Sequence, residues 1–302
     1  MSVSGRLRLD GSVGTFAGFT ARAASGIDSP RQDTMYWGGL RRKNGGYVAL
    51  IRRSVDGIWE TLSEEPLASG AGLVRFDVVG DSLKLFLDGG LVGFVRDRVL
   101  TTGGEAGFRS TAGTAVEDFA VAEVVLPTAA FPFRDNFPLA DGSQLNRFWD
   151  ARSGNFTVQE GRLVGANPVN TTTLRAALAA DASIAMTVRV PTAGTHAGVL
   201  ARGVPQRNTA HWGGLVNRSG SLAAEIWRIV DGRVTVLSAS PLAAAADVDH
   251  ELEFSLIGAD LSLAVNGSPG VATIDSTLAA AGLFGMRATS GATIDAWAIE
   301  TA

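Results

Sequence analysis

Two aromatic clusters are the residues of this 302-residue chain best suited to contact a ligand. Tyr36-Trp37 and His211-Trp212 each precede a Gly-Gly pair, and Trp227 follows on the next apolar run. An aromatic ring beside glycines keeps an open face, on which a sugar ring can stack. Because the cluster occurs twice, core packing is the alternative role for the same rings. We therefore expect the ligand-binding residues among Tyr36, Trp37, His211, Trp212 and Trp227.

Acid residues show no catalytic pair in the sequence. Glycoside hydrolysis needs two carboxyl groups about 5–10 Å apart. The acids that occur in both halves of the chain, such as Asp56 and Asp231, fall in turn sequences, where the carboxylate satisfies local backbone donors. The three histidines have neither HxH nor HExxH spacing. We expect no enzymatic activity; a glycoside hydrolase-like enzyme remains an alternative, with acids that converge only in the folded chain.

Composition excludes several other classes. The net charge is −4, with no clustered basic face, so we expect no nucleic-acid partner. No apolar run approaches the ~20 residues of a membrane helix, so we expect no membrane insertion. The chain has no cysteine, which excludes disulfides and thiolate metal sites. Its first residues lack the apolar core of a signal peptide, which leaves export as part of a longer precursor as one expectation.

The chain contains an internal duplication. Six collinear blocks match at offsets that drift only between 175 and 180 residues, so the insertions are the size of loops. The matched pairs are Thr15–Arg22 with Thr195–Arg202, Tyr36–Leu40 with His211–Leu215, Arg53–Gly57 with Arg228–Gly232, Leu62–Leu67 with Leu237–Leu242, Leu83–Gly89 with Leu261–Gly267, and Gly107–Gly113 with Gly285–Gly291. We assign residues 1–126 to the first copy, 127–132 to a Pro-bracketed linker and 133–302 to the second copy.

The two copies are unequal at their starts. Gly5-Arg-Leu7 resembles Gly161-Arg-Leu163, and the first copy has no counterpart of residues 133–160. Missing strands leave unpaired sheet edges and an uncovered core. We therefore expect an open edge in the first copy. Truncation of a longer domain is one explanation, and pairing with copies of itself or another chain is the other.

Strand signals dominate both copies. Arg75–Val79 and Glu253–Ile257 alternate between apolar and polar residues, and Ser82–Leu87 places three leucines on one side of a strand. Asp-Gly and Asn-Gly pairs between these runs favour hairpin turns with positive φ. The pattern predicts an all-β chain of two tandem antiparallel β-sandwiches, or jelly rolls, of which the first lacks its opening strands.

The opening blocks of the second copy resemble a known family. Asp135-Asn-Phe137, Trp149, Asn155–Val158 and the closing Gly285-Met-Arg287 are similar to those of laminin-G-like and concanavalin A-like (lectin/glucanase) jelly-roll domains, which occur in bacterial surface and phage tail proteins. The resemblance implies an extracellular or cell-surface module that binds glycan or another surface polymer and serves in adhesion. The alternative is a structural repeat of a surface fibre or a phage tail, and hence a virion protein.

The resemblance also implies a metal site. Asp135 and Asp295 lie near the start and the end of the second copy, where such jelly rolls can hold a structural Ca²⁺ ion through oxygen ligands. We therefore name Asp135 and Asp295 as candidate calcium ligands, and we expect no other cofactor.

Overall fold

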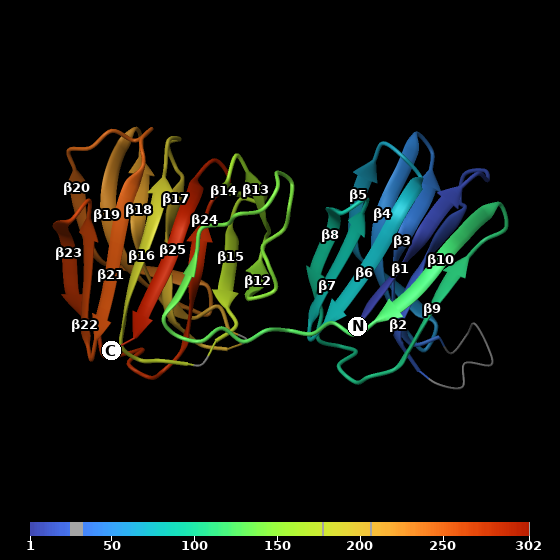
Figure 1. The fold of residues 1–302 in the computed structure, drawn as a ribbon, viewed down its shortest axis with the longest axis horizontal. Coiled ribbons are helices and arrows are strands. Elements are labelled where there is room, and N and C mark those ends of the chain that lie inside the picture. The colour runs from blue at the N-terminus through green and yellow to red at the C-terminus, as the bar shows by residue number, and fades with distance from the viewer. Residues whose placement is uncertain (25–32, 177, 206, 302) are drawn as a thin grey trace. The chain divides into compact units, whose positions relative to one another are not determined.

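The computed structural model describes residues 1–24, 33–176, 178–205 and 207–301. Within these ranges every regular element is a β-strand, which confirms the all-β prediction (Figure 1). No helix in the described part of the chain is long and apolar enough to cross a membrane. The chain folds into two compact units, Met1–Val125 and Leu126–Ala302.

The first unit is a sandwich of two five-stranded antiparallel sheets, in the orders β10-β1-β6-β7-β8 and β5-β4-β3-β2-β9. Val74, Phe76 and Val78 alternate with more exposed residues along β6 and lie in the core between the sheets. The strands are β1 (Ser2–Leu9), β2 (Phe16–Ala23), β3 (Met35–Lys43), β4 (Gly46–Val55), β5 (Ile58–Leu67), β6 (Ala71–Val79), β7 (Ser82–Leu87), β8 (Gly90–Arg96), β9 (Glu105–Ser110) and β10 (Thr114–Ala122).

The second unit is a larger sandwich of the same kind. Its sheets have the orders β13-β14-β25-β16-β21-β22-β23, with β11 also pairing with β25, and β12-β15-β24-β17-β18-β19-β20. The strands are β11 (Phe133–Asp135), β12 (Trp149–Ser153), β13 (Phe156–Gln159), β14 (Arg162–Gly165), β15 (Asn170–Leu174), β16 (Ala182–Arg189), β17 (His196–Gly203), β18 (Ala210–Arg218), β19 (Ser221–Val230), β20 (Arg233–Leu242), β21 (His250–Ile257), β22 (Asp260–Val265), β23 (Ser268–Ile274), β24 (Leu283–Ala288) and β25 (Thr293–Thr301).

Strands β1–β10 correspond in order and pairing to β16–β25, so the duplication seen in the sequence is a duplication of fold. One sequence match was wrong. Gly5-Arg-Leu7 lies on β1, between β10 and β6, which is the position of β16 in the second unit. Leu163 instead lies on β14, beyond β25. Within its described residues, the first unit therefore has no counterpart of any of the strands β11–β15.

The predicted hairpin turns are confirmed. Asp56, Asp88, Asp231 and Asn266 all have φ between 47° and 50°, and each precedes a glycine with positive φ. Two successive residues in this region match the right-handed twist of the flanking strands, which is why Asp-Gly and Asn-Gly connect them.

Without counterparts of β11–β15, apolar side chains of the first unit stay exposed. Phe108 on β9 and Phe119 on β10 are 56% and 42% exposed. Their counterparts Met286 and Trp297 are completely buried, and Trp297 packs edge-on against Trp149 of β12. The predicted open edge is thus present at β9 and β10. What pairs with it stays a prediction.

Candidate functional site

The Trp-Gly-Gly motif is explained by a tryptophan that lies flat on its own sheet. On β3, Gly38 faces the core against Phe76, so Trp37 points to the outer face of the sheet. A Cβ atom on Gly18 or Gly39 would collide with the Trp37 ring. Only glycine therefore permits the ring to lie this close to the strands. The second unit repeats the arrangement.

A hollow of about 250 Å³ opens beside Trp37 on this outer face. Three aromatic rings contribute to it: Phe16 meets Trp37 edge-on at 5.7 Å, and Trp59 comes from β5, which lies beyond β4 at the edge of the sheet. The complete lining is Gly14, Phe16, Trp37, Arg41, Leu50, Arg52, Trp59 and Arg109. Trp37 itself is only 3% exposed and forms the floor, whereas Trp59 is partly exposed at the side.

Three arginines share this hollow with the aromatic rings. The guanidinium carbons of Arg52 and Arg109 lie 4.8 and 5.0 Å from the centre of the Trp59 ring, in cation–π contact. Arg109 also forms an ion pair with Asp33. Burial, and then the nearby charges of Arg41 and Arg109, lower the pKa of Arg52. Positive charge is thus concentrated in a site that is partly shielded from water.

The same place in the second unit is filled by its own side chains. Trp227 occupies the position of Arg52 and stacks on Trp212, with ring centres 4.0 Å apart. His196 stands edge-on to both rings. Glu225, which is fully buried, accepts hydrogen bonds from Trp227 Nε1 and Arg218 Nε at 2.6 Å each. These contacts cover the ring faces that a sugar would need.

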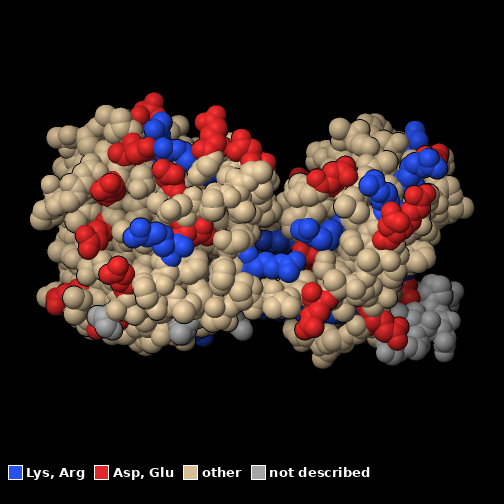
Figure 2. All heavy atoms as spheres, in the orientation of Figure 1, with Lys and Arg blue, Asp and Glu red and all other residues tan. Residues whose placement is uncertain are grey.

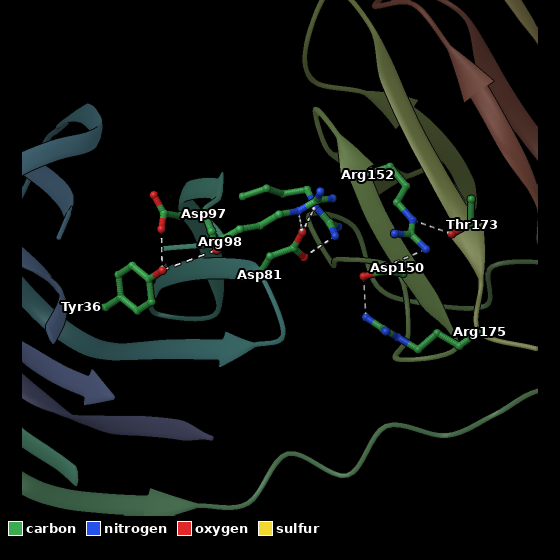
Figure 3. Close-up of polar contacts among 9 residues, drawn as sticks. Tyr36, Asp81, Asp97, Arg98, Asp150, Arg152, Thr173 and Arg175 are labelled. Carbon is green, nitrogen blue, oxygen red and sulfur yellow. Dashed lines mark hydrogen bonds and ion pairs between the residues drawn. The ribbon is translucent and has the colours of Figure 1, made fainter. Parts of the chain in front are cut away.

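Tyr36 and His211 point the other way, into the sandwich core. Both are 0% exposed. The Tyr36 hydroxyl donates to Asp97 (Figure 3), and burial with this bond raises the pKa of Tyr36 to about 12. His211 lies 3.4 Å from the carboxylate of Asp275. Of the five aromatic residues named from the sequence, only Trp37 therefore lines this hollow. Tyr36, His211, Trp212 and Trp227 are packing residues.

The two candidate calcium ligands do not converge. Asp135 uses both carboxylate oxygens as acceptors, from Trp149 Nε1 at 2.8 Å, Asn146 Nδ2 at 2.9 Å and the Phe137 amide at 2.9 Å. Asp295 is 44% exposed and lies 3.7 Å from an Arg162 nitrogen. N–H donors and a guanidinium occupy the positions that a cation would need. Among the described residues, no group of three or more His, Cys, Asp or Glu is placed to hold a metal ion.

Many other carboxylates serve as structural partners of arginine. Asp81 pairs with Arg96 and Arg98 in the first unit, and Asp150 with Arg152 and Arg175 in the second (Figure 3). Over the surface shown in Figure 2, acidic and basic side chains are interspersed. This mixture matches the small net charge.

A second hollow, of about 320 Å³, lies on the outer face of β16, β21 and β25. Its lining includes Glu251 and Glu253, which alternate with the buried Leu252 and so share one face of β21. Two such residues are separated by about 6.6 Å along a strand. The sequence interpretation missed this pair, although Glu-Leu-Glu on an alternating strand was a readable signal.

Sequence reasoning also missed Arg41 and Trp59. Trp59 has no aromatic counterpart in the second copy, where Val234 stands, so a search guided by the repeat passed over it. Arg41, Arg52 and Arg109 lie on three different strands, and the register of β2, β3, β4 and β9 brings them to one place.

Comparison with solved structures found matches at low sequence identity. The chain matches no protein-family model and no curated protein sequence. The carbohydrate-binding module CBM66 from Bacillus subtilis is 11% identical, with a TM-score of 0.43, and the match covers 51% of this chain and 92% of the module. A xylan β-1,4-xylosidase from Bacillus halodurans C-125 is 16% identical, with a TM-score of 0.44, and the match covers 88% of this chain and 63% of the xylosidase. The GH43 protein BlXynB from Bacillus licheniformis is 12% identical, with a TM-score of 0.44, and the match covers 98% of this chain and 65% of BlXynB.

These matches correct one expectation. GH43 glycoside hydrolases match between 88% and 98% of the chain, which contradicts the firm expectation of no enzymatic activity. This chain spans less than two thirds of the length of the two glycosidases named above. At such low identity the matches transfer no residue and no substrate. They are with all-β proteins, and the finer laminin-G resemblance stays a prediction.

Proposed function

We propose that this protein binds glycan in the hollow of the first unit. The observation that carries the proposal is the open aromatic wall of Trp59 above the Trp37 floor, with a space of about 250 Å³ between the lining residues. This volume lies below the ~300–1,000 Å³ of sites that enclose drug-sized ligands, so it suits one sugar residue of a longer chain. Aromatic rings stack on the apolar face of a sugar, and guanidinium groups donate to its oxygens.

Binding to a panel of soluble polysaccharides tests the proposal, by affinity electrophoresis and calorimetry on the full chain. Trp59→Ala should weaken binding about tenfold, since the loss of one stacking contact is on the order of 1.4 kcal/mol. The matched control is Phe108→Ala, which removes an exposed aromatic ring from the core side of the same sheet. No binding across the panel, or equal loss in both variants, would contradict the proposal.

We further propose that binding takes place outside the cell, where polymeric glycans are presented. Detection of the protein in the culture medium or on the surface of its source cells supports this setting. Recovery from the cytoplasm alone would contradict it.

A second candidate function is glycoside hydrolysis at Glu251 and Glu253. Their backbones are about 6.6 Å apart along the strand, so both carboxyl groups can reach the same hollow, which Arg134 also lines. A pair of carboxyl groups in one hollow is what glycoside hydrolysis requires. Release of reducing sugar from a glycoside panel, abolished by both Glu251→Gln and Glu253→Gln, would favour this candidate. Absence of turnover would dismiss it and leave the binding proposal unaffected.

A further inference from the structure

We propose that the hollow of the first unit selects acidic sugars, in which a carboxylate or a sulfate group meets the three guanidinium groups. The inference rests on the proposed function and names the class of glycan. It follows from the arrangement of Arg41, Arg52 and Arg109, from the partners they have among the described residues and from the contrast with the second unit.

The three arginines reach the hollow from three strands. Arg41 lies on β3, Arg52 on β4 and Arg109 on β9. Trp59 fixes two of them, because Arg52 and Arg109 both stack on its ring. A guanidinium held in this way is already oriented, so less side-chain entropy is lost when it binds an anion. Planar guanidinium groups match carboxylate and sulfate oxygens through paired hydrogen bonds.

The positive charge of the cluster is only partly balanced by the described part of the chain. Arg109 pairs with Asp33, but among the residues that the structure describes no carboxylate forms an ion pair with Arg41 or Arg52. The Nε atoms of Arg41 and Arg52 are buried and have no hydrogen-bond partner within the same described ranges. Partly desolvated donors without acceptors cost free energy, and an anionic ligand would supply both the charge and the acceptors.

The fold itself does not require the arginine cluster. In the second unit the positions of Arg41 and Arg52 hold Val216 and Trp227, and only Arg109 has an arginine counterpart, Arg287. That unit forms the same sheet with a filled, apolar surface at this place. The partly desolvated guanidinium groups of Arg41 and Arg52, unpaired among the described residues, therefore cost free energy that the fold does not require. We take this as support for a role of these two arginines in ligand binding.

The experiment compares charged and uncharged forms of one polymer on the full chain. Polygalacturonate is paired with its fully methyl-esterified form, dextran sulfate with dextran, and a single-stranded oligonucleotide represents another class of polyanion. We expect at least about tenfold tighter binding of one acidic sugar polymer than of its uncharged partner. The carboxylate and sulfate pairs separate the two sources of charge.

Arginine variants assign the preference to this site. Arg52→Gln should reduce the preference for the acidic form about tenfold, because it weakens binding of the acidic polymer more than binding of the uncharged one. Arg41→Gln should act in the same direction, and Arg52→Lys should restore part of the preference because the charge remains. Arg6→Gln, an exposed arginine of the other sheet, is the control and should change nothing. Melting curves of each variant verify that it is folded.

The outcomes are distinguishable. Equal binding of charged and uncharged polymers, still weakened by Trp59→Ala, would overturn this inference and preserve the proposed function. Absence of binding to every polysaccharide would overturn both. Tighter binding of the oligonucleotide, lost in Arg52→Gln, would overturn the assignment to sugars.

Discussion

One place on the outer sheet face is hollow in the first unit and filled in the second. Both units keep a tryptophan flat on a bed of glycines, Trp37 and Trp212. Around it, Arg52 in the first unit stands where Trp227 stands in the second. Trp227 closes the surface by stacking on Trp212 at 4.0 Å, whereas Arg52 leaves Trp37 beside an open space. The two units thus share the same sheet and the same buried tryptophan. At this place the side chains of the second unit pack against each other, whereas those of the first unit leave a hollow that a ligand can enter.

The largest expected effect is a difference in the free energy of unfolding between variants at this place in the two units. Trp227→Ala should destabilise the second unit by about 3–5 kcal/mol, because it creates a cavity against Trp212 and removes a hydrogen-bond donor from the buried Glu225. Arg52→Ala, at the same place in the first unit, should cost about 1 kcal/mol or less.

Hydrogen exchange of the full chain measures each unit separately, since the amides of β19 and β4 report on the two sites. Comparable losses in the two variants would contradict the division into a packed copy and an open copy.

The second prediction concerns pH. Burial, together with the charge of Arg287, lowers the pKa of His196 to about 4, from an ordinary value near 6.5. In the unfolded chain the imidazole binds a proton at the higher pH, so the second unit loses stability as pH falls from about 6.5 to about 4. The loss attributable to His196 is at most about 3 kcal/mol.

His196→Phe installs the residue type that the first unit has at this place, Phe16, and removes the titration. Denaturant unfolding at pH 7 and pH 4.5 should show a smaller decrease for the variant than for the parent chain. The pKa of His211 is also lowered, chiefly by burial, and its contribution should remain in both proteins. An identical decrease in the two proteins would refute the assignment to His196.

The sequence predicted the framework better than the site, for a physical reason. Strand period, Asp-Gly turns and the repeat are local or periodic signals, and the structure confirms them. The hollow depends on which side chains meet across β3, β4, β5 and β9. Register between strands decides that Arg52 and Arg109 both reach Trp59, and no spacing in the sequence reveals it. The repeat also led us to predict Trp212 as a ligand-binding residue, but Trp227 and His196 cover its ring in the second unit.

The smallest expected effect concerns the open edge. Phe119→Ala in the first unit should cost about 1 kcal/mol or less, because the ring is already 42% exposed. Trp297→Ala, at the equivalent position of the second unit, should cost about 3–5 kcal/mol, because β11 and β12 cover that ring. Thermal unfolding of both variants checks the contrast. A large loss for Phe119→Ala would mean that another chain or segment covers the first unit's edge in solution.

The most direct test of the account transplants the filled surface onto the open one. Arg52→Trp places in the first unit the residue type that closes the second, where it can stack on Trp37. The account predicts that this variant loses glycan binding at least about tenfold while the first unit melts at an equal or higher temperature. Calorimetric titration of the full-length variant with the tightest-binding polysaccharide measures it. Unchanged affinity in a folded Arg52→Trp protein would contradict the assignment of the hollow as the binding site.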